Sequence, residues 1–251
     1  MAKIPIGVQL YSVRDDCKKD LLATLKAVAK MGYSGVEFAG YHNWSASDLR
    51  KTLDDLGLKC CGTHTSYDSV QAGELQKTID YNLTIGNKYL IVPWMSEDKR
   101  NSRETCIATS KVLSGIVEKL KPHGLLTGYH THDCDCKPLP TRDTAWEVIA
   151  DNTPPNFVMQ LDTANAMHGG ADPVALLKKY PGRTKTIHLK EMPHPNKKDL
   201  IGEGTVQWKE VFSICESTAG TEWYIVEHEV YEMPPLDCIA GCLKNLRGMG
   251  K

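Results

Sequence analysis

The sequence has no long hydrophobic run and no excess of charge of either sign. No apolar stretch approaches the roughly 18 to 20 residues that a membrane span requires. Among 251 residues, 30 are Lys or Arg and 31 are Asp or Glu, which leaves a formal net charge of −1. Such a charge offers little attraction for a phosphate backbone. We therefore expect neither a membrane protein nor a partner of nucleic acids.

Signals for secretion and for a structural zinc site are also missing. The N-terminal segment is interrupted by Pro5, Gln9 and Ser12, so it lacks the continuous apolar core of a signal peptide. The nine cysteines contain no Cys-x-x-Cys repeat of the kind found in zinc ribbons. Because an odd number cannot all pair within one chain, we expect mostly buried, reduced thiols. These features predict a mature chain that starts at Met1 and a cytoplasmic location.

What the sequence does contain is a regular alternation of short β-rich apolar runs with longer amphipathic segments. The candidate strands are Ile4–Leu10, Gly35–Phe38, Lys59–His64, Tyr89–Pro93, Leu125–Tyr129, Phe157–Leu161, Thr186–Leu189 and Trp223–Glu227. The candidate helices are Lys19–Met31, Ser45–Leu56, Glu74–Thr84, Arg103–Leu120, Thr144–Ile149, Pro173–Lys179, Trp208–Cys215 and Leu236–Leu246. This alternation predicts βα units around a parallel sheet.

Eight βα units in 251 residues match the size and rhythm of a single (β/α)8 TIM barrel. No linker rich in Pro, Gly or Ser divides the chain, so residues 1–251 are predicted to form one catalytic α/β domain. An open doubly wound sheet is the competing architecture. The first strand, however, is not followed by a Gly-x-Gly-x-x-Gly motif or a P-loop. The barrel is favoured, and barrel enzymes place their chemistry at the carboxyl ends of the strands.

Potential metal ligands follow four successive predicted strands. The fifth strand runs into the segment from His130 to Asp135, the sixth ends at Asp162, the seventh at His188 and the eighth at Glu227. Strand ends of a barrel converge on one pocket, where uncompensated carboxylates would repel one another. One divalent cation, Mn²⁺, Mg²⁺, Co²⁺ or Zn²⁺, would remove that repulsion in an open site. The alternative is a set of separate polar groups that cap helices and bond to loops.

Six segments stand in a fixed order along the chain. They are IGVQLYSVR, GYSGVEF, GYHTHDCDCKPL, DPVALLKKYPGRTKTIHLKEM, IGEGTVQWKEVF and WYIVEHE. This set resembles the sugar phosphate isomerase/epimerase family, whose members have a xylose isomerase-like TIM barrel. In that family a Glu after strand five, an Asp at strand six, a His at strand seven and a Glu at strand eight bind one divalent metal. The resemblance implies ligand roles for Asp162, His188 and Glu227.

The fifth strand departs from the family pattern. Relatives typically read His-x-His-x-x-Glu-Phe there, whereas this chain reads HTHDCDC from His130 onward. Asp135 therefore stands in the place of the Glu, with a side chain one methylene shorter. The resemblance implies that Asp135 is the metal ligand from strand five. His132 is the alternative, if the shorter carboxylate yields its place to a neighbour.

The resemblance also implies the chemistry, which is removal of a proton α to the carbonyl of a keto-sugar or related polyol by a metal-dependent isomerase or epimerase. The predicted acid–base residues are His130, His132 and Glu227. An imidazole titrates near neutral pH, which suits it to remove the proton, and Glu227 or the second histidine could return it. A keto-sugar or inosose dehydratase, a keto-glycoside lyase and a non-catalytic sugar-binding barrel are the alternatives. A DNA phosphodiesterase on a similar barrel is disfavoured by the near-neutral charge.

Four further residues are predicted to bind a small carbohydrate. Glu37 and His64 would bind hydroxyl groups, Trp94 would stack on a sugar face, and Lys190 would reach a substrate oxygen. Each has a structural alternative as a hydrogen-bonded, salt-bridged or core residue, and Tyr11 is assigned to the core. No Gly-rich phosphate-binding turn is present, which favours an unphosphorylated sugar. Family members often form dimers or tetramers, so a homo-oligomer is compatible with the resemblance.

Overall fold

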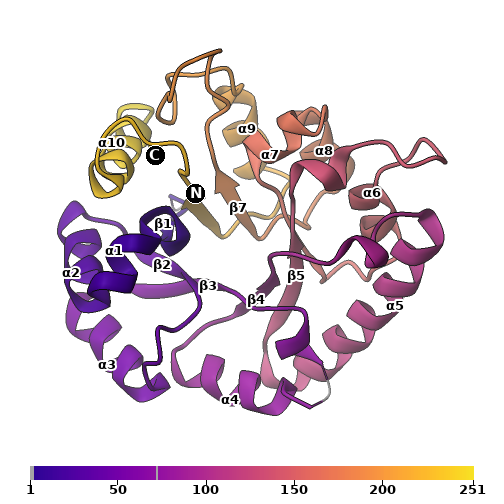
Figure 1. Cartoon of the computed structure of the whole chain (residues 1–251), viewed down its shortest axis with the longest axis horizontal. Helices are drawn as coiled ribbons and strands as arrows, with labels where there is room; N and C mark the ends of the chain where they lie inside the picture. Colours follow the sequence, from indigo (N-terminus) through magenta and orange to yellow (C-terminus); the bar gives the residue numbers. More distant parts are fainter. Residues whose placement is uncertain (1–2, 72) are drawn as a thin grey trace.

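The computed structural model describes residues 3–71 and 73–251, and its centre is a parallel barrel of eight strands (Figure 1). The strands are β1 (Ile6–Gln9), β2 (Gly35–Ala39), β3 (Lys59–His64), β4 (Tyr89–Val92), β5 (Leu126–His130), β6 (Val158–Gln160), β7 (Thr186–Leu189) and β8 (Trp223–Val226). Their hydrogen-bonded order is β6-β5-β4-β3-β2-β1-β8-β7. The predicted fold is confirmed, and every predicted strand is present with bounds within about two residues.

The barrel closes between β6 and β7, close to the carboxyl ends of these strands. The backbone amide of His188 donates to the Leu161 carbonyl at 2.9 Å, and Asp162 and His188 form an isolated parallel bridge. Residues paired in a parallel bridge direct their side chains to the same side of the sheet. Two of the predicted metal ligands therefore lie side by side at the closing seam.

Helices surround the barrel on its outer face (Figure 1). They are α1 (Arg14–Lys19), α2 (Leu21–Met31), α3 (Ala46–Leu56), α4 (Leu75–Thr84), α5 (Arg103–Leu120), α6 (Ala145–Asp151), α7 (Thr163–His168), α8 (Pro173–Lys179), α9 (Trp208–Cys215) and α10 (Pro235–Gly248). Ser45 caps α3 by accepting from the Asp48 amide, and Gly57 ends that helix with a φ of 66°. The short helices α1 and α7 were not predicted, because six residues are too few to show a helical period.

The buried side chains fill the barrel and the layer between its strands and helices. Val8, Leu90 and Ile187 have no exposed surface, and they come from strands distributed around the barrel. All nine cysteines are free, and eight of them are buried, which confirms their interpretation as small hydrophobic core residues. Within the described ranges, no helix is long and apolar enough to cross a membrane.

Candidate metal centre and active site

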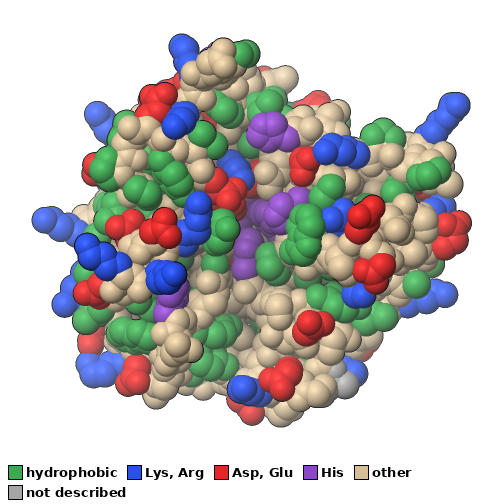
Figure 2. Space-filling view, viewed as in Figure 1, with side chains coloured by type: hydrophobic (Ala, Val, Ile, Leu, Met, Phe, Trp, Pro, Cys, Tyr) green, Lys and Arg blue, Asp and Glu red, His purple; other side chains and the backbone are tan. Residues whose placement is uncertain are grey.

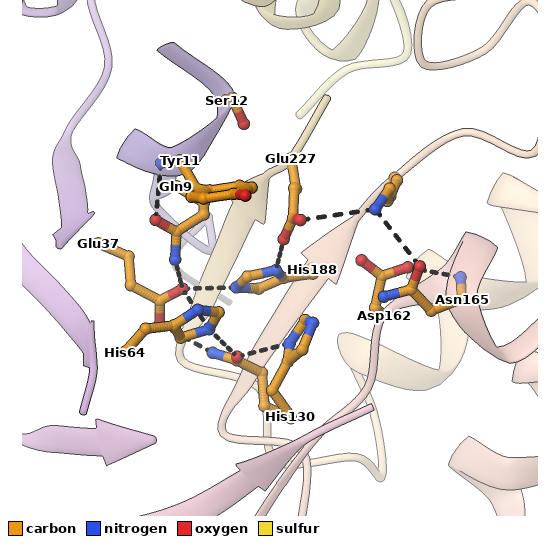
Figure 3. A network of polar contacts seen from close by, with 12 residues as sticks. Gln9, Tyr11, Ser12, Glu37, His64, His130, Asp162, Asn165, His188 and Glu227 are labelled. Atoms are coloured by element: carbon orange, nitrogen blue, oxygen red, sulfur yellow. Dashed lines mark hydrogen bonds and ion pairs between the residues drawn. The ribbon is translucent and has the colours of Figure 1, made fainter. Parts of the chain in front are cut away.

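Four ionisable side chains meet at the carboxyl end of the barrel (Figure 3). They are His130 at the end of β5, Asp162 after β6, His188 in β7 and Glu227 after β8. One potential ligand atom from each lies within 4.8 Å of the others, and all four residues are buried. We call this group the four-residue cluster. The sequence predicts three of these residues as metal ligands and His130 as a catalytic residue.

The carboxylate of Asp162 tests whether a cation fits the cluster. Its Oδ1 accepts from the Asn165 amide at 2.7 Å and so caps α7, whereas Oδ2 is buried with no hydrogen-bond partner among the described residues. Burial raises the pKa of Asp162 to about 7, although the charge of Lys190 opposes that rise. A buried acceptor without a partner is costly. A divalent ion between the four side chains would satisfy this oxygen, so the donor set fits a metal.

His188 lies between two carboxylates, one at each ring nitrogen, and a metal ion in the cluster would take the place of the proton on Nδ1. Nε2 is 2.5 Å from Oε2 of Glu37, and Nδ1 contacts Oε2 of Glu227. Burial alone would lower the pKa of His188, but Glu37 and Glu227 raise it to about 10. Burial likewise raises the pKa of Glu37, but the charges of His64 and His188 outweigh it and hold that pKa below its usual value. Glu37 is thus ionised and orients the histidine, as carboxylates beside metal-binding histidines do.

Glu37 lies fully buried beneath the cluster. Its Oε2 also accepts from Gln9 at 2.7 Å, and its Oε1 accepts from Gln160 at 2.9 Å. A Cβ on Gly62 would lie 2.4 Å from Oε1, so only glycine at that position leaves room for the carboxylate. Because Glu37 is occupied by these donors and does not line the cavity described below, its placement favours an orienting role over the predicted contact with substrate.

Gln160 sets the tautomers of two histidines. Its amide nitrogen donates to Glu37, which can only accept when ionised, so the amide oxygen must face His64 and His130. That oxygen lies 2.9 Å from Nδ1 of His130 and 3.0 Å from Nε2 of His64. Both of these nitrogens must therefore carry the proton. Burial holds the pKa of His130 well below its usual value, so Nε2 of His130 keeps its lone pair for a metal ion.

A cavity of about 710 Å³ opens onto the cluster. The predicted site residues that line it are His64, Trp94, His130, His132 and Glu227. In Figure 2 the hollow at the centre of this face is lined by histidine side chains, with acidic and hydrophobic side chains around it. A cavity of this size and composition is typical of a small-molecule site.

His132 stands beside the cluster without belonging to it. Its ring packs edge-on against Trp94 and against His130, with centroids 4.9 and 5.0 Å apart. Its Nδ1 is buried and has no partner among the described residues. Burial lowers the pKa of His132 to about 4, although Glu227 opposes that shift. The ring is therefore neutral near pH 7 and available as a proton acceptor.

Lys190 balances the negative charge at the end of β8. Its Nζ lies 3.5 Å from Oε1 of Glu227 and pairs with Glu229. Burial lowers the pKa of Lys190, but the neighbouring carboxylates, led by Glu227, raise it well above its usual value. Lys190 is thus a permanent cation beside the cluster. A salt bridge with the adjacent Glu191 is the structural alternative for Lys190, but the Glu191 carboxylate instead accepts from the amides of Gly202 and Val206.

The structure does not bring Asp135 to the cluster. Its Oδ2 accepts from the backbone amide of His132 at 2.8 Å, its Oδ1 accepts from the Tyr129 hydroxyl at 2.9 Å, and Nε of Arg100 lies 3.7 Å away. The strand ends at His130, and Asp135 lies in the following 3-10 turn η5 (Asp133–Cys136). His130 therefore takes the place expected for Asp135, and the placement does not support the predicted ligand role of Asp135 or the alternative with His132.

The comparison with known sequences points to sugar-processing proteins. The profile of a family described as a xylose isomerase-like TIM barrel matches residues 25–246. An inosose dehydratase of Geobacillus kaustophilus is 27% identical over 194 residues, which cover 68% of this chain and 61% of that protein. A 2-oxo-tetronate isomerase of Haemophilus influenzae is 22% identical over 231 residues, covering 83% and 87% of the two chains. The chain thus matches less than two thirds of the length of the dehydratase.

Solved structures share the fold. A sugar phosphate isomerase/epimerase from Parabacteroides distasonis superposes with a TM-score of 0.83 at 22% identity, covering 98% of this chain and 94% of that one. A structure described as the IOLI protein with a bound zinc atom superposes with a TM-score of 0.71 at 17% identity, covering 97% of each chain.

Proposed function

The chain belongs to the xylose isomerase-like TIM barrel family, and we propose from this membership and from its site that it is a divalent-metal enzyme acting on a keto-sugar or related polyol. The proposed reaction begins with removal of the proton α to the carbonyl group. One observation carries the proposal: Asp162, whose Oδ2 has no partner among the described residues, belongs to a four-residue cluster that opens into a cavity lined by His132.

The residues that would hold the cation are His130, Asp162, His188 and Glu227. When bound, the ion would supply positive charge against the substrate oxygen on which negative charge develops. Two imidazoles with two carboxylates suit Zn²⁺, Co²⁺ or Mn²⁺ better than Mg²⁺, which prefers oxygen ligands. The zinc atom of the similar structure is in line with this preference.

His132 is the proposed base. It lines the cavity, and its low pKa keeps the ring unprotonated at neutral pH. His130 is less suited to that role, because its Nδ1 proton is bound to Gln160 and its Nε2 belongs with the ligands. Lys190 holds Glu227 ionised, so this carboxylate also stays a ligand in the proposal.

The step that follows removal of the α-proton decides the overall reaction. Return of the proton to the other face gives epimerisation, return to the neighbouring carbon gives isomerisation, and departure of a β-oxygen gives dehydration or lysis. The two relatives are named as a dehydratase and an isomerase. Our proposal therefore commits to the shared first step.

The test is exchange of the α-proton in D₂O, followed by NMR with metal-loaded protein and a panel of ketoses, inososes and keto-glycosides. We expect exchange with at least one of these classes. His132→Gln should slow exchange by about 10² to 10⁴-fold, the usual contribution of a general base, with bound metal unchanged. His123→Gln is the matched control, because His123 is exposed and lies outside the cavity.

Two results would count against this function. Unchanged exchange in His132→Gln would remove this residue as the base. No exchange with any of the compounds, despite a full equivalent of bound metal, would favour a sugar-binding barrel without catalysis.

A further inference from the structure

Two aromatic rings stand half exposed at the cavity. Tyr11 is 45% exposed, Trp94 is 50% exposed, and both line the cavity. Each ring is backed by a guanidinium group: Cζ of Arg14 lies 4.6 Å from the Tyr11 centroid, and Cζ of Arg100 lies 4.4 Å from the Trp94 centroid. Apolar surface left open in this way beside a cavity indicates a ligand contact rather than a core position.

The Trp94 ring is held in place by the buried Arg100 and the half-buried His132. Arg100 is 9% exposed, and its Nε donates to the Met95 carbonyl at 2.9 Å and lies 3.7 Å from Oδ1 of Asp135. The His132 ring makes a perpendicular contact with the indole. These contacts fix the orientation of Trp94 before any ligand arrives, which lowers the entropy cost of binding.

The cavity has more room than the metal centre uses. Its inner end is formed by buried groups such as His130, whereas Tyr11 and Trp94 lie toward solvent. Ser66 and Ser69 line the same cavity, and their hydroxyl groups lie 2.7 Å from each other. A volume of about 710 Å³ falls in the range of roughly 300 to 1,000 Å³ that holds drug-sized ligands, which is more than one six-carbon sugar fills.

We propose that Tyr11 and Trp94 form a second subsite, which binds a pyranose ring glycosidically linked to the sugar unit at the four-residue cluster. The C–H face of a pyranose packs on an aromatic ring, and its hydroxyl groups bond to side chains such as those of Ser66 and Ser69. The mixture of aromatic and hydroxyl groups fits a carbohydrate better than a hydrocarbon. The preferred substrate is then a keto-glycoside with two rings. This inference rests on the proposed function of the inner end.

The test is calorimetric titration of the metal-loaded protein with glucose and with the glucosyl disaccharides trehalose, maltose, cellobiose and gentiobiose. We expect at least one disaccharide to bind about tenfold more tightly than glucose, since stacking of this kind contributes about 1 kcal/mol or more. Trp94→Ala should remove that gain, and Trp94→Tyr should retain most of it. Leu83→Ala is the matched control, because Leu83 is 45% exposed but lies on α4 outside the cavity.

Arg100→Lys tests the support beneath the ring. A lysine keeps the charge but loses the planar group that stacks on Trp94. Affinity for the disaccharide should fall about threefold, with no change in affinity for glucose. A purely structural role of Arg100 would change both affinities together.

The outcomes separate this inference from the proposed function. Equal affinity for glucose and every disaccharide, or no binding of any sugar, overturns the second subsite whether or not α-protons exchange. A preference for a disaccharide that Trp94→Ala leaves intact overturns it as well. A preference that depends on Trp94 supports the subsite even if no α-proton exchange is found, in which case only the proposed function fails.

Discussion

Asp162 and Asp135 are both fully buried aspartates at the carboxyl end of the barrel, but their surroundings differ. Asp162 keeps Oδ2 free of hydrogen bonds among the described residues and lies with three other potential ligands. Asp135 uses both oxygens, which accept from the Tyr129 hydroxyl and the His132 amide. We propose that an acceptor without a hydrogen-bond partner, rather than burial itself, distinguishes the metal ligand Asp162 from the structural carboxylate Asp135.

Desolvation acts on the two carboxyl groups in the same direction. Burial raises the pKa of Asp162 to about 7 and that of Asp135 to about 6. A raised pKa therefore does not separate the two roles. The hydrogen-bond partners do, and the following variants test that distinction.

Removal of a cluster residue should have the largest effect. Asp162→Ala and His188→Ala each delete one member of the donor set, so we expect bound metal to fall from about one equivalent to a trace, with loss of α-proton exchange. Asp135→Ala should keep its metal. Elemental analysis after manganese loading and desalting measures the bound metal of all three variants. Metal lost from Asp135→Ala but kept in Asp162→Ala would reverse our assignment.

Loss of Gln160 should weaken the metal site without deleting a ligand. In Gln160→Ala the Nδ1 proton of His130 loses its acceptor, so the ring no longer holds one tautomer. Such orienting groups typically change metal affinity by about 10 to 100-fold. Competition with a fluorescent chelator measures the affinity. Gln76→Ala on the exposed face of α4 is the control, and an unchanged affinity in Gln160→Ala would refute the tautomer argument.

Asp135 should matter for folding rather than for metal. Asp135→Ala leaves the half-buried His132 amide without its acceptor and the buried Arg100 without a charge partner, which should cost about 3 kcal/mol of unfolding free energy. Urea denaturation of the metal-free proteins measures this cost. Asp133→Ala in the same turn is the control, because Asp133 forms only a surface pair with Lys137 and should change stability by less than about 1 kcal/mol.

The raised pKa of Asp135 gives its stability effect a defined pH dependence. A carboxyl group whose pKa is about 6 in the folded protein, against about 4 in the unfolded chain, contributes stability below pH 4 that is lost as the pH rises through 6. The free energy of unfolding of the wild type, relative to Asp135→Asn, should therefore fall by about 2 kcal/mol between pH 4.5 and pH 7. Urea titrations of both metal-free proteins test this, and a difference that grows with pH would contradict it.

The sequence predicts the barrel well because the same βα pattern recurs eight times along the chain. Each strand is a short apolar run followed by an amphipathic helix, and the bounds of α5, α8 and α9 agree with the prediction. The same regularity places Asp162, His188 and Glu227 at the carboxyl ends of successive strands, and the structure brings them together.

The sequence is a weaker guide to the position of residues that lie in turns between the strands and helices. A family motif implies that Asp135 replaces a ligand, but the distance from the end of β5 to a residue in η5 depends on the path of the turn. Residue type predicts a core position for Tyr11, and this is wrong, because Tyr11 stands in a short 3-10 turn and is half exposed. Gln9 and Gln160 carry no charge, so residue type alone indicates neither a ligand nor an acid–base role for them, although Gln160 lies two positions before Asp162 in a predicted strand.

The most direct test of this account is the position of the bound metal in a crystal of the manganese-loaded protein, located by anomalous scattering. We predict one strong peak within about 2.0 to 2.3 Å of ligand atoms from His130, Asp162, His188 and Glu227. Asp135 should still hold its hydrogen bonds to Tyr129 and His132. A peak coordinated by Asp135, or no peak in the four-residue cluster of a fully loaded protein, would contradict the central claim.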